Sequence, residues 1–203
     1  LLDDGTIYFR EMVNAVRNML EERGLQPVFV DTFRPAQEQQ LSLVRRLAQA
    51  GATHVFIGGT RGDVAIVARD AIQQGVDLTL LGAEALSARE TDVPLEPGVL
   101  AIGIPEYGEL PPAADLADLA ESQGIIPEGY VVPAASAVDV ASQAMAAADG
   151  DAARLAAMLA AGQFDTALGP VSFTDRHELQ DNPYFLLRWQ GNQFVPVFDS
   201  ARQ

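Results

Sequence analysis

The first hundred residues alternate between two apolar patterns, and this alternation constrains the fold more than any other feature of the sequence. Apolar residues recur at helical spacing over 9–20, 41–48 and 64–72, and a glycine follows each segment. Short, continuously apolar runs, predicted to be buried strands, lie at 27–30, 55–57, 78–81 and 99–102. Buried strands joined through helices form a parallel sheet with helices on both faces. The sequence therefore predicts an α/β fold with a doubly wound parallel sheet.

The pattern changes after Ile104. Pro105, Pro111 and Pro112 lie in a stretch that is typical of a crossover between lobes. Alanine-rich helices are predicted next, over 113–122, 133–148 and 151–161. Strand character returns from Gly169 onward, over 171–173, 184–189 and 194–198, and the last two runs are predicted to form a hairpin.

Charge and composition exclude several classes of function. The 28 acidic and 13 basic residues give a formal net charge of −15, so we expect neither nucleic acid nor anionic membranes as partners. The absence of cysteine excludes disulfides and thiolate zinc sites, and His54 and His177 have no spaced histidine partner, so no metal or cofactor is expected. No apolar run approaches the ~20 residues that span a bilayer, which argues against direct membrane insertion.

Several short signatures follow one another along the chain. They are Tyr8 at the first helix, Leu43-Val44-Arg45-Arg46-Leu47, Val55-Phe56-Ile57-Gly58-Gly59, Ala68-Arg69 before Gly75, Gly82-Ala83-Glu84, and Gly169-Pro170-Val171-Ser172-Phe173-Thr174. These signatures are weak singly but specific in this order, in which the chain resembles the leucine/isoleucine/valine-binding proteins, which are periplasmic binding proteins of type I. The resemblance extends from Ile7 to about Val197.

This resemblance implies two doubly wound lobes, hinge strands between them, and a small ligand, an amino acid, held in the cleft. Residues 1–107 would then be the second lobe, 108–168 helices returning to the first lobe, and 169–203 the C-terminal strands and hairpin near the hinge. The opening half of the first lobe is expected to precede Leu1. The resemblance further implies an exported, periplasmic, non-catalytic receptor whose partner is a membrane ABC permease.

Candidate ligand-binding residues follow two of the predicted strands. Ligands of open parallel sheets bind beyond the carboxyl ends of the strands, where Gly59, Thr60 and Arg61 open a helix. A glycine lets a ligand approach the backbone, a threonine can donate its hydroxyl, and an arginine can pair with a carboxylate. The alternative is a tight strand-to-helix turn with a solvated arginine. The family places a ligand-contacting side chain just after this double glycine, although arginine at position 61 departs from its usual residue.

Three further candidates depend mainly on the resemblance. Glu84 follows the next strand, where the family's amino-acid binders carry the acid that receives the ligand ammonium; otherwise it is a surface or capping glutamate. Tyr8 matches a tyrosine whose ring covers the ligand, and Tyr130 lies where the family brings an aromatic side chain near the cleft. For Tyr8, a half-buried aromatic residue at the start of a helix is the alternative. Ala135 departs from the family, which often has tyrosine there, so packing near it must differ.

Two other functions remain open at this level. A sensor of the same fold would regulate a partner instead of delivering cargo. An α/β enzyme would use Glu84 and Asp63 as acid and base, but no third group orients either carboxylate and no nucleophile is evident. Tight binding of an unchanged ligand would favour a binding protein or sensor, and turnover would favour the enzyme.

Overall fold

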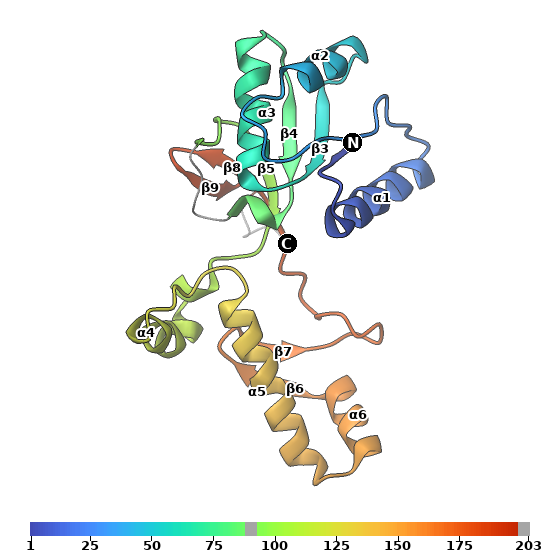
Figure 1. Cartoon of the computed structure of the whole chain (residues 1–203). Helices are drawn as coiled ribbons and strands as arrows, with labels where there is room; N and C mark the ends of the chain where they lie inside the picture. Colours follow the sequence, from blue (N-terminus) through green and yellow to red (C-terminus); the bar gives the residue numbers. More distant parts are fainter. Residues whose placement is uncertain (88–92, 199–203) are drawn as a thin grey trace. The chain divides into compact units, whose positions relative to one another are not determined.

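The computed structural model describes residues 1–87 and 93–198, and the chain divides into two compact units (Figure 1). Unit 1 consists of Leu1–Gly103 and Phe185–Gln203, and unit 2 is Ile104–Tyr184. The boundary expected from the sequence lay after Tyr107, with 169–203 as a separate segment. In the structure the chain returns to unit 1 at Phe185, and positions 199–203 of the expected segment lie outside the described residues.

Unit 1 contains a seven-stranded sheet in the order β2-β1-β3-β4-β5-β8-β9. The strands from β1 to β5 pair in parallel, and β8 and β9 add antiparallel partners beside β5. Their bounds are β1 (Leu2–Asp3), β2 (Asp31–Thr32), β3 (His54–Gly58), β4 (Thr79–Gly82), β5 (Leu100–Gly103), β8 (Phe185–Gln190) and β9 (Gln193–Pro196). The predicted doubly wound α/β fold and the C-terminal hairpin are confirmed.

The crossovers of unit 1 change direction between β1 and β3. Helix α1 (Ile7–Glu22) leads from β1 to β2, on one side of β1, whereas α2 (Leu41–Gln49) leads back past β1 to β3. Helix α3 (Arg61–Gln73) continues in the second direction and packs against α2. Because each parallel crossover is right-handed, this reversal sends α1 to one face of the sheet and α2 with α3 to the other. The gap between β1 and β3 is therefore the topological switch point.

Two details of the predicted sheet were wrong. The run at 27–30 is not a buried strand, since pairing starts at Asp31 and Val28 is 67% exposed; only Phe29 of this run packs against the core. Strand β1 was missed because its two residues are too few to give a periodic signal. Strands β1 and β2 have two residues each, and a hydropathy pattern does not locate strands this short.

The main core of unit 1 joins the sheet to helices α2 and α3. It contains Leu2 of β1, the inner faces of α2 and α3, and buried positions of β3, β4 and β5. Leu187 and Trp189 of β8 belong to the same cluster. All members of this cluster are unit 1 residues.

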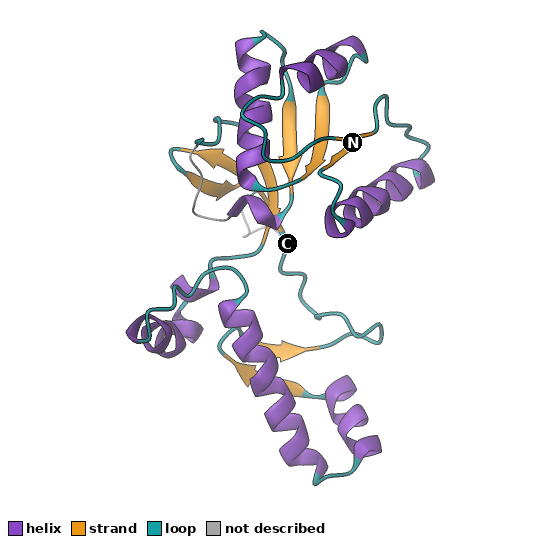
Figure 2. Cartoon of the chain, in the orientation of Figure 1, coloured by secondary structure: helices purple, strands orange, loops and turns teal. Residues whose placement is uncertain are grey.

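Unit 2 is mostly helical (Figure 2). It contains η2 (Tyr107–Glu109), η3 (Pro111–Ala113), α4 (Ala114–Ser122), α5 (Val131–Ala148), α6 (Ala152–Ala161) and a two-stranded sheet of β6 (Gln163–Thr166) and β7 (Gly169–Ser172). The three alanine-rich helices are confirmed, whereas β6 was missed. The core is small: Val140, Ala144, Phe164 and Val171 form its buried centre.

By length and composition alone, helix α5 is apolar enough to cross a membrane. Alanine supplies most of its apolar character. The helix packs against α6 and β6 through one face, where Val140 and Ala144 are buried. Core helices of soluble proteins pass the same test, so this property alone assigns no membrane role.

Candidate ligand site at the strand ends of unit 1

The carboxyl ends of β1, β3 and β4 lie side by side at one edge of the unit 1 sheet. The register pairs Asp3 with Gly58 and Phe56 with Leu81, so the loops that follow these three strands emerge together. This edge includes the switch point between β1 and β3, where open α/β sheets bind ligands. We call Tyr8, Gly59, Thr60, Arg61 and Glu84 the strand-end residues; all five belong to unit 1.

Two buried acids fix the loop between β1 and α1. Asp3 accepts hydrogen bonds from the Gly5 amide (2.9 Å) and from the Thr32 hydroxyl (3.1 and 3.2 Å to its two oxygens). Asp4 accepts from both the amide and the hydroxyl of Thr6, at 2.9 and 2.7 Å. Thr6 is the N-cap of α1, so these bonds determine where the helix begins and where its second residue, Tyr8, projects. No sequence pattern indicated this loop, because β1 is too short to produce one.

Tyr8 and Glu84 are brought together by the fold. The Tyr8 hydroxyl donates a hydrogen bond to Glu84 Oε1, although the two residues are 76 positions apart in the sequence. Tyr8 is 55% exposed, and Glu84, at the start of η1 (Glu84–Ser87), is partly exposed. The Glu84 carboxylate is therefore accessible to solvent at this edge, and the Tyr8 hydroxyl fixes its orientation.

Thr60 caps helix α3 and is bound to Asp63. The Thr60 hydroxyl accepts from the Asp63 amide (3.3 Å) and donates to Asp63 Oδ2 (2.7 Å). Asp63 is only 5% exposed, and its Oδ1 accepts from the Ala36 amide at 2.7 Å. Both oxygens of this carboxylate are thus engaged, one by the Ala36 amide and the other by the Thr60 hydroxyl, which argues against Asp63 as the acid or base of an enzyme.

The double glycine after β3 is required by packing. A Cβ on Gly58 would lie 2.9 Å from Cβ of Phe9, and a Cβ on Gly59 would lie 2.9 Å from Cζ of Phe33. Larger residues would push α1 and the 33–36 loop away from the strand end. Gly59 therefore has a structural role, whether or not a ligand approaches it.

Arg61 is occupied by protein groups. Its Nη1 donates to the Leu86 carbonyl oxygen at 3.1 Å, and its guanidinium carbon lies 4.5 Å from the centre of the Trp189 ring. Burial lowers the pKa of the Arg61 guanidinium from its ordinary value, which still leaves the group charged at neutral pH. No sequence pattern indicates the contact with Trp189, because the two residues are far apart in the chain.

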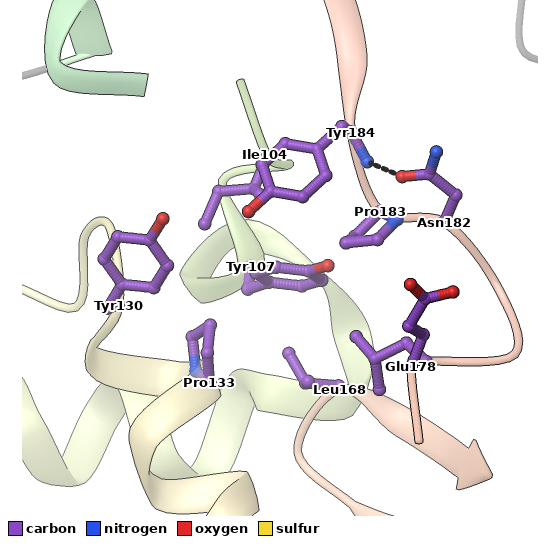
Figure 3. Close-up of a pocket in the computed structure, with 10 residues that line it drawn as sticks. Ile104, Tyr107, Tyr130, Pro133, Leu168, Glu178, Asn182, Pro183 and Tyr184 are labelled. Carbon is purple, nitrogen blue, oxygen red and sulfur yellow. Dashed lines mark hydrogen bonds between the residues drawn. The ribbon is translucent and has the colours of Figure 1, made fainter. Parts of the chain in front are cut away.

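Tyr130, the sixth candidate, lies in unit 2 and lines a separate pocket of about 500 Å³. Figure 3 shows Tyr107, Tyr130 and Tyr184 around this pocket, with Glu178 at its side. Burial, and to a lesser extent Tyr184, raises the pKa of Tyr107 above its ordinary value. Neither Tyr107 nor Tyr184 was among the candidate ligand-binding residues, because no motif distinguishes them.

The described residues contain no group of three or more His, Asp or Glu side chains that could hold a metal ion. What the strand-end edge offers is one oriented carboxylate, an exposed aromatic ring and the start of a helix. This set suits non-covalent recognition of a small polar molecule. A doubly wound sheet with such an open edge is the arrangement at which α/β proteins bind ligands.

The chain belongs to the periplasmic binding protein family, whose model matches residues 1–193. A curated relative is the leucine-, isoleucine-, valine-, threonine- and alanine-binding protein of Pseudomonas aeruginosa, which is 24% identical over 194 residues. That alignment covers 93% of this chain and 52% of the relative. The chain therefore spans about half the length of the curated relatives it matches.

Solved structures of similar fold include binding proteins for two kinds of ligand. A leucine-binding protein from Thermotoga maritima superposes with a TM-score of 0.70 at 16% identity, covering 96% of this chain and 58% of the other. A solute-binding protein of an ABC transporter from R. palustris, in complex with benzoate, gives 0.69 at 17% identity, covering 97% and 56%. At these identities the similarity establishes the fold, and the ligand differs between the neighbours.

Proposed function

We propose that this chain provides one wall of the ligand site of an ABC-transporter solute-binding protein, and that its ligand is an amino acid. The observation that carries the proposal is the Tyr8–Glu84 hydrogen bond at the switch-point edge of unit 1. It orients a carboxylate that solvent can reach, at the position where sheets of this topology bind ligands. The family membership supports a solute-binding role over an enzymatic one.

The charges at this edge suit a zwitterion. The Glu84 carboxylate would receive the ammonium group of the ligand, since a charged donor and a charged acceptor form the stronger kind of hydrogen bond. The α3 N-terminus, capped by Thr60, supplies a partial positive charge for the ligand carboxylate. Tyr8 would cover the bound molecule with its ring.

In the complete protein, we propose that the ligand is enclosed in an interlobe cleft by hinge closure, and that a membrane ABC permease recognises the closed state in the periplasm. Closure requires that the ligand bind the closed form more tightly than the open form. Contacts on both walls of a cleft supply such a difference. A sensor of the same fold would close in the same way but would have a different partner.

The test is isothermal titration calorimetry of the complete protein with L-leucine, and with benzoate as a probe that lacks the amine. Glu84→Gln removes the charge while retaining an oxygen and the approximate size of the side chain. We expect it to weaken leucine binding about ten- to hundredfold, because a hydrogen bond to a charged group is worth ~1.5–3 kcal/mol. Glu21→Gln is the matched control: this acid lies on α1 and pairs with Arg17.

Equal leucine affinity in Glu84→Gln and in the unmodified protein would contradict the role of Glu84. Binding of benzoate without binding of leucine would contradict the amino-acid ligand but leave a solute-binding role intact. Chemical analysis of the ligand after incubation separates binding from catalysis, and turnover would overturn the proposed function as a whole.

A further inference from the structure

Arg61 connects three parts of unit 1 that are distant in the sequence. It is the first residue of α3, directly after the loop that ends β3. Its side chain reaches η1 through the Leu86 carbonyl and reaches β8 through the Trp189 ring. A planar guanidinium can stack on an indole and still donate hydrogen bonds in its own plane, whereas a lysine ammonium is a compact point charge.

The η1 turn that Arg61 holds is the turn that carries Glu84. Leu86, two residues after Glu84, is fully buried, and its side chain fills the space beside Gly82, where an added Cβ would lie 2.5 Å from Cδ1 of Leu86. The turn is thus held on one side by the packing of the Leu86 side chain. On the other side, Arg61 binds the Leu86 carbonyl.

Trp189 is held in place by backbone hydrogen bonds and by a ring contact. The Trp189 amide donates to the Val99 carbonyl at 2.8 Å, and its own carbonyl accepts from Gly98 at 3.0 Å. Its ring packs edge-on against Phe194, with ring centres 5.0 Å apart. Trp189 therefore gives Arg61 a rigid surface to stack on.

We propose that Arg61 is a positioning residue, which holds the η1 turn so that Glu84 faces Tyr8 and thereby sets the preference of this site for ligands with an ammonium group. The sequence suggested that Arg61 pairs with the ligand carboxylate, and these contacts favour a role through Glu84 instead. The ligand preference rests on the proposed function. The placement of Glu84 does not, because it depends on the contacts of Arg61 with Leu86 and of Tyr8 with Glu84 itself.

The first experiment therefore needs no ligand. Carbon-13 labelling of tyrosine in the complete protein gives a ring Cζ signal for Tyr8, assigned by its loss in Tyr8→Phe. The signal should shift in Glu84→Gln, and Arg61→Gln should shift it in the same direction, because Glu84 moves away from the phenol. Arg61→Lys should shift it less. Arg69→Gln is the matched control: Arg69 is also on α3, where it pairs with Asp70 at 2.7 Å, and the Tyr8 signal should stay in place.

The second experiment measures the affinity for L-leucine. Loss of the Arg61 contacts should weaken binding about tenfold, and much less when Glu84 is already glutamine, since two residues that act through one interaction are not additive. A merely structural role for Arg61 would give the same loss in both backgrounds. An unshifted Tyr8 signal in Arg61→Gln, or additive losses, overturns the positioning role. Failure of the unmodified protein to bind leucine overturns the proposed ligand, while the Tyr8 signal still decides the role of Arg61.

Discussion

Units 1 and 2 are both built from helices and strands, yet they differ in how much of their apolar surface each one buries. In unit 1, helices α2 and α3 share one core with the seven-stranded sheet, and five strands, β1, β3, β4, β5 and β8, contribute a buried residue to it. In unit 2, helices α5 and α6 pack with a two-stranded sheet, and α6 has no buried residue. Several large apolar side chains of unit 2 remain exposed: Leu110, Leu119, Ile125, Ile126, Val138 and Met145.

The two units differ in the contacts that stabilise them. The strands of unit 1 are paired with one another and packed against helices of the same unit, so contacts within the unit specify its fold. The alanine-rich helices of unit 2 have small side chains and little apolar area to bury against one another. Unit 1 should therefore be the more stable of the two, and a ligand site at its edge rests on a rigid support.

The largest expected effect comes from removing matched leucines from the two cores. Leu47→Ala, in α2, should cost about 2–5 kcal/mol because the side chain is fully buried. Leu155→Ala, in α6, should cost about 1 kcal/mol because that side chain is only partly buried. Urea unfolding of each variant measures both values.

The two transitions can be followed separately. Trp189 is the single tryptophan of the chain and lies in unit 1, so its fluorescence reports that unit, whereas far-ultraviolet circular dichroism also reports the helices of unit 2. Leu47→Ala should lower the fluorescence midpoint, and Leu155→Ala should leave it nearly unchanged. If both variants lowered the midpoint of the fluorescence transition equally, the proposed difference between the two units would be contradicted.

A smaller effect is expected from two helix caps. Thr60 caps α3 in unit 1, and Asp151 caps α6 in unit 2 by accepting from the amides of Ala153 (2.8 Å) and Arg154 (3.1 Å). Replacing either residue by alanine should cost ~1 kcal/mol. Thr60→Ala should lower the unfolding midpoint of unit 1, whereas Asp151→Ala should speed amide hydrogen exchange in α6 alone. Faster exchange in α3 on losing Asp151 would contradict this independence.

The smallest effect concerns the tyrosine pocket of unit 2. The pKa of Tyr107 is raised in the folded chain, so this phenol keeps its proton at pH values where the unfolded chain has lost it. Its contribution to stability is complete below the ordinary tyrosine pKa near 10 and is lost as the pH rises through the higher folded value. Tyr107→Phe should remove one late-titrating phenol from an absorbance titration at alkaline pH. If all four tyrosines of the unmodified protein lost their protons near the ordinary tyrosine pKa, the raised pKa of Tyr107 would be contradicted.

The sequence predicted the helices and the longer strands well, because each depends on a local pattern of apolar residues. It failed for β1 and β2, whose two residues each are too few for such a pattern, and for β6, whose four residues are mostly polar. Of the candidate site, it identified Tyr8 and Glu84 but not the hydrogen bond between them. Asp3, Asp4 and Trp189 were missed because their roles depend on which strands become neighbours, and no local spacing encodes that.

The position of the ligand is tested most directly by a nitrogen-15 chemical-shift map of the complete protein, titrated with L-leucine. If the strand-end residues form the site, the largest shifts should fall on the amides of Tyr8, Thr60 and Glu84, with the Glu84 shifts reduced in Glu84→Gln. Shifts centred instead on Tyr107 and Tyr184, at the pocket of unit 2, would place the ligand elsewhere and contradict the account.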